Sequence, residues 1–183
     1  DLRFEELAPK GQVDLVVIGC PQASLEEIRI TASEVRCHCE LGMVIPDERL
    51  WVFTSGENYE LAEADGSIGI LEEAGAVILQ DTCPEVTPYN RKLYNHLMTN
   101  SLKAEHYLTS GLNKIPTSVG TISDCVEHAF NPNLCQGEVS PLKAKSQPQH
   151  ASSKTYQSGS FSSTGSGLNS QEDWVVEGIA MVT

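Results

Sequence analysis

An apolar run leads directly into a helix start in Val13-Asp14-Leu15-Val16-Val17-Ile18-Gly19-Cys20-Pro21-Gln22-Ala23-Ser24-Leu25-Glu26-Glu27. Residues 13–18 have the length and the branched side chains of a buried strand. Gly19 permits unusual backbone angles and Pro21 has no N–H for a sheet ladder, so we expect the strand to end here. Cys20 would then lie on a loop at the end of the strand.

A helix is predicted immediately after this loop. Ser24 and Glu27 have the spacing of a capping box, which predicts a helix over 24–35. The alternation of apolar runs and capped helices continues to residue 130. Further strands are expected at 50–54, 76–79, 96–99 and 117–120, and further helices at 55–66, 70–74, 100–107 and 121–130. This order predicts an α/β fold with a layered, mostly parallel sheet and helices on both faces.

The α/β pattern stops before the chain does. Of the 183 residues, we assign 1–138 to the folded domain. Residues 139–172 are rich in serine and glycine and bury too little apolar surface to offset the entropy of ordering, which predicts a flexible, disordered linker. Residues 173–183 have the pattern of a first strand. Since the chain has no initial Met, we expect it to be part of a longer protein.

Charge and cysteine content limit the partners. The formal net charge of −13 argues against nucleic acid, because phosphate binding needs clustered Lys and Arg. No apolar run approaches the roughly 20 residues that span a bilayer, so no membrane partner is expected. Six cysteines without a secretory signal indicate reduced thiols or metal ligands, and we expect a cytoplasmic location.

Two cysteines are expected on loops at one edge of the sheet, where open α/β sheets bind ligands. They are Cys20 and Cys83, and each is followed by a proline. The helix that begins at Ser24 should point its free amides at Cys20 and stabilise a thiolate there. Two thiolates on one edge suit a soft metal or an iron–sulfur cluster.

A third loop at the same edge offers an amide, a hydroxyl and a cation. These groups belong to Asn100, Ser101 and Lys103, at a predicted helix start. They form a candidate cradle for a carboxylate or a phosphate. The alternative is that Ser101 only caps the helix.

Three segments resemble the aconitase X family in order and spacing. They are Val16-Val17-Ile18-Gly19-Cys20-Pro21-Gln22-Ala23-Ser24-Leu25-Glu26-Glu27, Asp81-Thr82-Cys83 and Met98-Thr99-Asn100-Ser101-Leu102-Lys103-Ala104-Glu105-His106-Tyr107. The family includes cis-3-hydroxy-L-proline dehydratase and the large subunit of phosphomevalonate dehydratase. Residues 1–138 would then be part of its catalytic domain, and 173–183 the first strand of a small swivelling, β-rich domain.

The resemblance implies an iron–sulfur hydro-lyase that eliminates water from a small hydroxy acid, such as cis-3-hydroxy-L-proline or 5-phosphomevalonate. Cys20 and Cys83 would be two of three cluster ligands, with the third cysteine outside this chain. Asn100, Ser101 and Lys103 would bind the substrate anion. The swivelling domain would act in cis or as a separate subunit, and the isolated segment would be inactive.

One residue departs from the family pattern, and two other interpretations stay open. Gln22 stands where the family usually has His, and an amide cannot shuttle a proton near neutral pH.

The chain could instead be a non-catalytic α/β binding or regulatory module that has kept the fold. A zinc module would need Cys37 or Cys39 to converge with Cys125, Cys135 or a histidine, although Cys37-His38-Cys39 lacks the spacer of a zinc knuckle.

Overall fold

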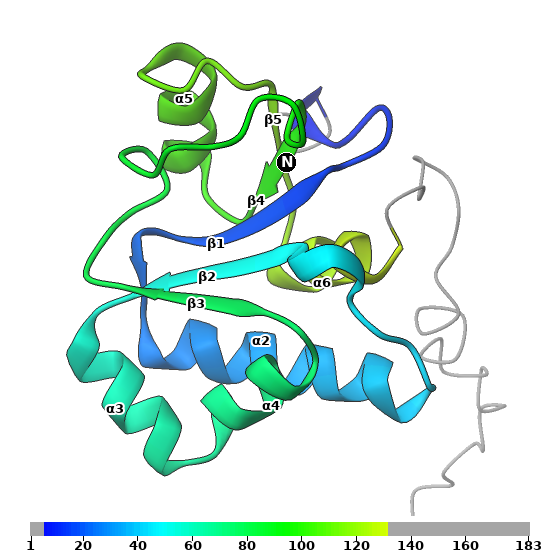
Figure 1. The fold of residues 1–183 in the computed structure, drawn as a ribbon, viewed down its shortest axis with the longest axis vertical. Coiled ribbons are helices and arrows are strands. Elements are labelled where there is room, and N and C mark those ends of the chain that lie inside the picture. Colours follow the sequence, from blue (N-terminus) through cyan, green and yellow to red (C-terminus); the bar gives the residue numbers. More distant parts are fainter. Residues whose placement is uncertain (1–5, 132–183) are drawn as a thin grey trace, which may run out of the picture. The chain divides into compact units, whose positions relative to one another are not determined.

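The centre of the molecule is a parallel sheet, which a computed structural model describes together with its helices over residues 6–131 (Figure 1). Its five strands lie in the order β3-β2-β1-β4-β5, and each pair of neighbours is parallel. Their bounds are β1 Leu15–Ala23, β2 Leu50–Thr54, β3 Val77–Gln80, β4 Leu97–Thr99 and β5 Thr117–Val119. The predicted α/β class and parallel sheet are therefore confirmed. The predicted linker and the strand at 173–183 lie outside the described residues.

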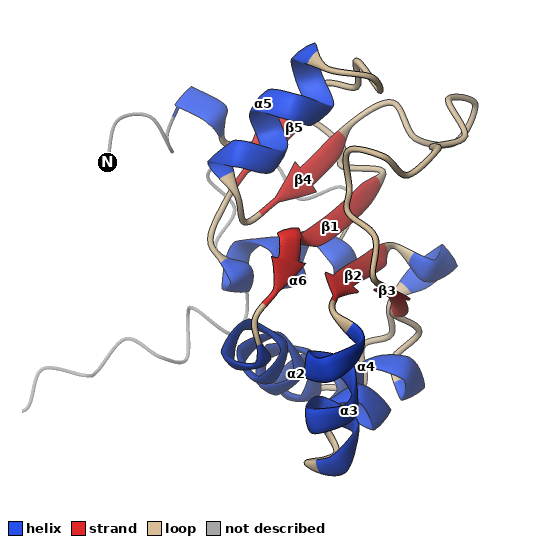
Figure 2. Ribbon diagram, turned by 90° about the vertical axis from the view of Figure 1, so that its left-hand side faces the viewer, coloured by secondary structure: helices blue, strands red, loops and turns tan. Residues whose placement is uncertain are grey.

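Helices cover both faces of the sheet (Figure 2). Their bounds are α2 Leu25–Glu40, α3 Gly56–Ala64, α4 Ser67–Glu73, α5 Leu102–Ser110 and α6 Ile122–Phe130, with a 3-10 turn at Pro46–Glu48. Val16 and Ile18 of β1 are fully buried in a cluster with α2, α4 and α6. Leu15 and Val17 are fully buried on the opposite face, in a cluster with α5. This alternation follows from the two-residue period of a strand.

Side-chain caps fix where the helices begin. Ser24 accepts from the backbone N–H of Glu27, whose carboxylate accepts in turn from the Ser24 N–H, so the predicted capping box is confirmed. Ser55, Ser101 and Thr121 cap α3, α5 and α6. These caps place the start of each helix at the end of the strand before it.

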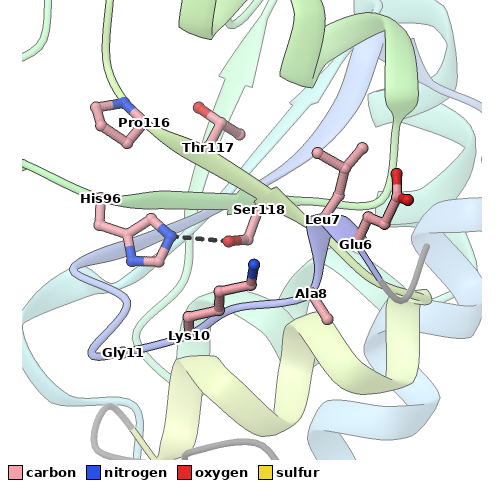
Figure 3. A pocket seen from close by; sticks show the side chains of 9 residues that line it. All are labelled: Glu6, Leu7, Ala8, Lys10, Gly11, His96, Pro116, Thr117 and Ser118. Carbon is pink, nitrogen blue, oxygen red and sulfur yellow. Dashed lines mark hydrogen bonds between the residues drawn. The ribbon is translucent and has the colours of Figure 1, made fainter. Parts of the chain in front are cut away.

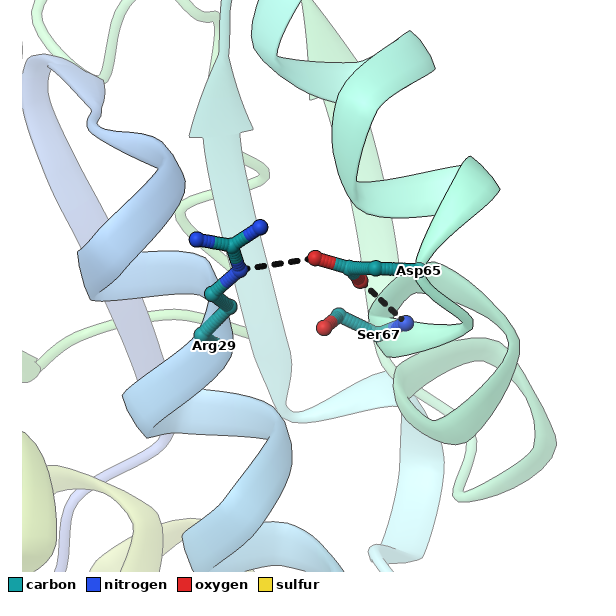
Figure 4. A network of polar contacts seen from close by, with 3 residues as sticks. All are labelled: Arg29, Asp65 and Ser67. Carbon is teal, nitrogen blue, oxygen red and sulfur yellow. Dashed lines mark hydrogen bonds and ion pairs between the residues drawn. The ribbon is translucent and has the colours of Figure 1, made fainter. Parts of the chain in front are cut away.

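Helix α2 is longer than predicted and ends at Glu40, whereas the prediction ended at residue 35. Its last turns are held by packing that the sequence pattern does not show. His38 is 2% exposed and stacks on Phe130 of α6, with ring centroids 4.7 Å apart. On the other side of α2, the Arg29 Nε lies 2.7 Å from the Asp65 carboxylate, which also accepts from the Ser67 N–H at the start of α4 (Figure 4).

Within residues 6–131, no helix is both long enough and apolar enough to cross a membrane.

Candidate functional site

Cys20 lies in a bulge of the central strand. The pairing between β1 and β2 is interrupted after Ile18 and resumes at Ala23, which pairs with Thr54. Gly19 adopts a φ of +96°, and a side chain there would collide with the backbone of Phe53 and Ala23. The expectation that the strand ends at Gly19 is therefore wrong: β1 passes through the cis Cys20–Pro21 peptide bond and continues to Ala23.

The far end of this bulge is fixed by side chains of the neighbouring elements. The carbonyl of Ala23 accepts from the Thr54 hydroxyl at 3.1 Å and from the Asn58 amide at 3.2 Å. Thr54, the residue of β2 on which the pairing resumes, is 31 residues from Ala23 in sequence. The local glycine and proline therefore could not reveal that the strand continues. Cys20 is thus presented by a strand that is anchored on both sides.

Cys83 lies in the long connection that follows β3. The hydroxyl of Thr87 donates to the carbonyl of Cys83, and the buried hydroxyl of Tyr89 donates to the carbonyl of Pro84, both at 3.0 Å. The Tyr89 ring stacks on Trp51 of β2 with centroids 5.8 Å apart, which docks the connection on the sheet. This half-buried thiol is therefore held by side chains, as expected for a loop.

The turn between β4 and α5 carries the third predicted set of residues. Asn100 Oδ1 accepts from the Gly19 N–H at 3.3 Å, and its Nδ2 donates to a Glu27 carboxylate oxygen at 3.0 Å. The Ser101 hydroxyl accepts from the Ala104 N–H at 3.3 Å and so caps α5. The helix-cap interpretation of Ser101 is confirmed, but the same side chain also hydrogen-bonds to Cys20.

The three segments meet around the Cys20 thiol. Burial raises the pKa of Cys20, and the nearby Cys83 and Glu85 raise it further. The Lys103 ammonium and the Ser101 hydrogen bond act in the opposite direction. The net direction differs from the stabilised thiolate that we expected from the start of α2, because desolvation is the largest effect. The structure therefore brings together Cys20, Cys83, Ser101 and Lys103, while Asn100 binds the backbone of Gly19 next to Cys20.

Two further residues of the site escape the sequence analysis. Glu85 places one carboxylate oxygen 2.7 Å from the Leu112 N–H, and its other oxygen is buried without a hydrogen-bond partner among residues 6–131. Tyr89 is 8% exposed, and its pKa is raised by burial first and then by Cys83, Glu85 and Cys20. Only their closeness to Cys83 in sequence hinted at them, because the contacts with β2 and with Leu112 are long-range.

The remaining described cysteines do not form a metal site. Cys37 and Cys39 are exposed near the end of α2. Cys125 is fully buried in α6, and burial raises its pKa. Between residues 6 and 131, no group of three or more His, Cys, Asp or Glu side chains could hold a metal ion. The zinc interpretation therefore has no support in this part of the chain, and Cys135 lies outside it.

A separate pocket opens at the other edge of the sheet, beside the beginnings of β4 and β5 (Figure 3). It has a volume of about 400 Å³ and is lined by Lys10, His96 and Ser118, among others. His96 lies 2.8 Å from the Gln12 carbonyl through Nδ1 and 2.8 Å from the Ser118 hydroxyl through Nε2. Since a carbonyl only accepts, Nδ1 donates to Gln12. These bonds tie the segment before β1 to β5.

Comparisons with known proteins place this architecture in context. Residues 13–131 match the model of the aconitase X third domain. The chain is 37% identical over 95 residues to the phosphomevalonate dehydratase large subunit of Methanothermobacter thermautotrophicus. The aligned region covers 52% of this chain and 22% of that protein. It is 34% identical over 137 residues to the cis-3-hydroxy-L-proline dehydratase of Pseudomonas aeruginosa, covering 69% of this chain and 22% of that protein.

A similar structure has been solved. The holo-form of aconitase X from Thermococcus kodakaraensis matches with a TM-score of 0.59 and 26% sequence identity, over 69% of this chain and 31% of that one. The chain thus spans only about a fifth of the length of the curated relatives named above.

Proposed function

The chain belongs to the aconitase X family, and we propose that it carries part of the active site of an iron–sulfur hydro-lyase that eliminates water from a small hydroxy acid. The observation that carries the proposal is the meeting of Cys20 and Cys83 with Ser101 and Lys103 at the carboxyl edge of the sheet. The relatives are named as dehydratases, so a binding module without chemistry is not favoured.

The donor set at this edge fits an iron–sulfur cluster. Cys20 and Cys83 are both half-buried, come from neighbouring segments, and lie close enough for one thiolate to oppose ionisation of the other. Soft sulfur ligands that share a site in this way suit iron. These two residues would hold the cluster, with a third cysteine from outside this chain. When bound, the cluster would supply an iron with an open coordination position, a Lewis acid for the departing hydroxyl.

The residues around the thiols would bind and orient the substrate. The Lys103 ammonium supplies a positive charge close to Cys20, which attracts a carboxylate or phosphate. The Ser101 hydroxyl is fixed by the α5 cap and can donate to the same anion. Asn100 holds the backbone next to Cys20 by accepting from the Gly19 N–H. Tyr89 and Trp51 stack on one another in the same apolar cluster as Cys20, and this aromatic surface would limit the access of water.

Elimination also requires a proton acceptor. A base must take a proton from the carbon next to the one that loses the hydroxyl. Gln22 cannot do this, so we assign the base to another part of the full-length protein.

The name of one relative, a large subunit, supports a small partner subunit or a fused small domain. A cytoplasmic location belongs to the same proposal. The candidate substrates are 5-phosphomevalonate and cis-3-hydroxy-L-proline.

The proposal is tested by anaerobic reconstitution of the full-length protein with iron and sulfide. Cys20→Ser and Cys83→Ser should each lose most of the bound iron and sulfide, whereas Cys37→Ser, at an exposed thiol, should retain them. The wild-type protein should dehydrate one of the two candidate substrates. Full iron and sulfide content in both Cys20→Ser and Cys83→Ser would overturn the proposal.

A further inference from the structure

We infer that Asn100 is a positioning residue, which serves the site by holding the backbone at Cys20 rather than by touching the substrate. The functional importance of Cys20 rests on the function proposed above. The geometry of the bridge that Asn100 makes stands on its own.

Asn100 closes a clamp around the bulge that carries Cys20. Its carbonyl oxygen accepts from the Gly19 N–H, directly before Cys20. Its amide nitrogen donates to Glu27 Oε1, while Glu27 Oε2 accepts from the N–H of Ser24 at 2.9 Å and from its hydroxyl at 2.8 Å. The bulge is thereby bound at Gly19 on one side and at Ser24 on the other, through two side chains in series.

The clamp satisfies a backbone group that the sheet leaves without a partner. The β1–β4 pairing ends where Val17 pairs with Thr99, so the N–H of Gly19, which faces β4, lies just beyond the end of this ladder. An unpaired N–H at this depth would be destabilising, because protein interiors leave few such groups without a partner. Asn100, 81 residues away in sequence, supplies the acceptor.

The chemistry of the two partners demands an amide at this position. A backbone N–H only donates, and the Glu27 carboxylate only accepts. The bridging side chain must therefore accept at one end and donate at the other, as the side chain of Asn100 does. Aspartate could still accept from Gly19 but would face Glu27 with a like charge. Both polar atoms of Asn100 are thus engaged within the protein, which leaves the neighbouring Ser101 and Lys103 to face the substrate.

This logic permits a rescue by exchange of the two groups. Asn100→Asp alone should break the clamp, and Glu27→Gln alone should weaken it, because one glutamine cannot accept from both Ser24 and Asn100. In the double variant Asn100→Asp/Glu27→Gln, the glutamine oxygen can accept from Ser24 and its nitrogen can donate to Asp at 100. The pattern of donors and acceptors is then restored.

The test follows alkylation of Cys20 by iodoacetamide in the cluster-free full-length protein, resolved by peptide mass spectrometry, together with iron content after reconstitution. The rate constant of the Cys20 thiolate, taken from the pH dependence of alkylation so that the added charge at position 100 does not enter, should rise about tenfold in Asn100→Asp. This matches the loss of one part-buried hydrogen bond to a charged group, and iron content should fall. The double variant should return both values to within about twofold of the wild type. Asn90→Asp is the matched control, since the Asn90 Oδ1 accepts from the Lys92 N–H and a carboxylate can do the same.

A substrate contact would behave differently. In that case Asn100→Asp would raise KM with unchanged alkylation and iron content, and Glu27→Gln would rescue nothing, which would overturn the inference. The proposed function fails on a separate observation, full iron content in Cys20→Ser and Cys83→Ser. Because alkylation is measured without the cluster, the clamp can be confirmed or refuted even then.

Discussion

Cys20 and Cys83 reach the same edge of the sheet, and each precedes a proline, but they are held there in different ways. Cys20 is part of β1 and is fixed by the backbone: a left-handed glycine before it and renewed strand pairing after it. Cys83 lies outside every strand and is fixed by hydroxyl groups that donate to the carbonyls beside it. Identical Cys-Pro pairs in the sequence thus have unlike structural support.

This difference indicates that the segment around Cys20 is more rigid than the loop around Cys83. Backbone pairing in a central strand yields only when the sheet opens, whereas a loop held by a few side chains opens locally. We therefore expect substitutions near Cys20 to affect the whole domain and substitutions near Cys83 to affect that loop alone. Four predictions test this contrast.

The largest effect is expected for Gly19→Ala. An alanine at a φ of +96° is strained, and its Cβ would collide with the backbone of Phe53 and Ala23. The free energy of unfolding, measured in urea, should fall by about 3 kcal/mol or more from strain and overpacking together. Gly11→Ala, where a Cβ meets open space, should stay within about 0.5 kcal/mol. Equal losses for the two variants would show that the bulge is not rigid.

Tyr89→Phe should act on the Cys83 loop alone. The change removes the hydroxyl that donates to the Pro84 carbonyl and should lower the free energy of unfolding by about 1 kcal/mol. Alkylation of Cys83 should become faster while that of Cys20 keeps its rate. Tyr94→Phe is the control, because the Tyr94 ring also packs on Trp51 while its hydroxyl makes no hydrogen bond within residues 6–131. If both thiols responded alike, the two supports would not be independent.

Lys103→Met should change the chemistry of Cys20 without loosening it. Burial raises the pKa of this thiol, and the Lys103 charge opposes that effect by favouring the thiolate. Removing the charge should raise the pKa further, so the rate of alkylation of the cluster-free protein should rise only at higher pH. Lys92→Met, at an exposed position on the loop, should leave the pH profile unchanged. A profile displaced to lower pH would contradict the placement of Lys103 beside Cys20.

The contrast also explains what could be read from the sequence. The capping box of Ser24 and Glu27 and the strand at Leu50–Thr54 depend on neighbouring residues, and both were predicted correctly. The continuation of β1 to Ala23 depends on Thr54, and no local pattern encodes that pairing. A glycine followed by Cys-Pro therefore indicated a strand end where the structure has a bulge.

The candidate site shows the same division. The sequence singled out Cys20, Cys83, Ser101 and Lys103 because it predicted them at strand ends or helix starts, and the structure brings these four residues together. Glu85 and Tyr89 were missed because their segment has no periodicity and its partners, Leu112 and Trp51, lie far away in sequence. The partners of Asn100 are likewise 81 and 73 residues away, so its place in the clamp required the structure.

The smallest effect is expected for Asp65→Asn. Asp65 lies at the end of α3 and pairs with Arg29 of α2, the helix that follows Cys20. Hydrogen bonds from Ser67, and then Arg29, lower the pKa of Asp65 from 3.8 to about 2. A lowered pKa in the folded state means that the stabilisation is present above the ordinary pKa and is lost as pH falls through about 2. The variant should therefore unfold at a slightly lower urea concentration at pH 7, and the difference should disappear at the acid end. Because the pair is exposed, alkylation of both cysteines should be unchanged. A faster rate at Cys20 would mean that α2 transmits distant changes to the bulge, and the backbone support of Cys20 would then be less local than the clamp requires.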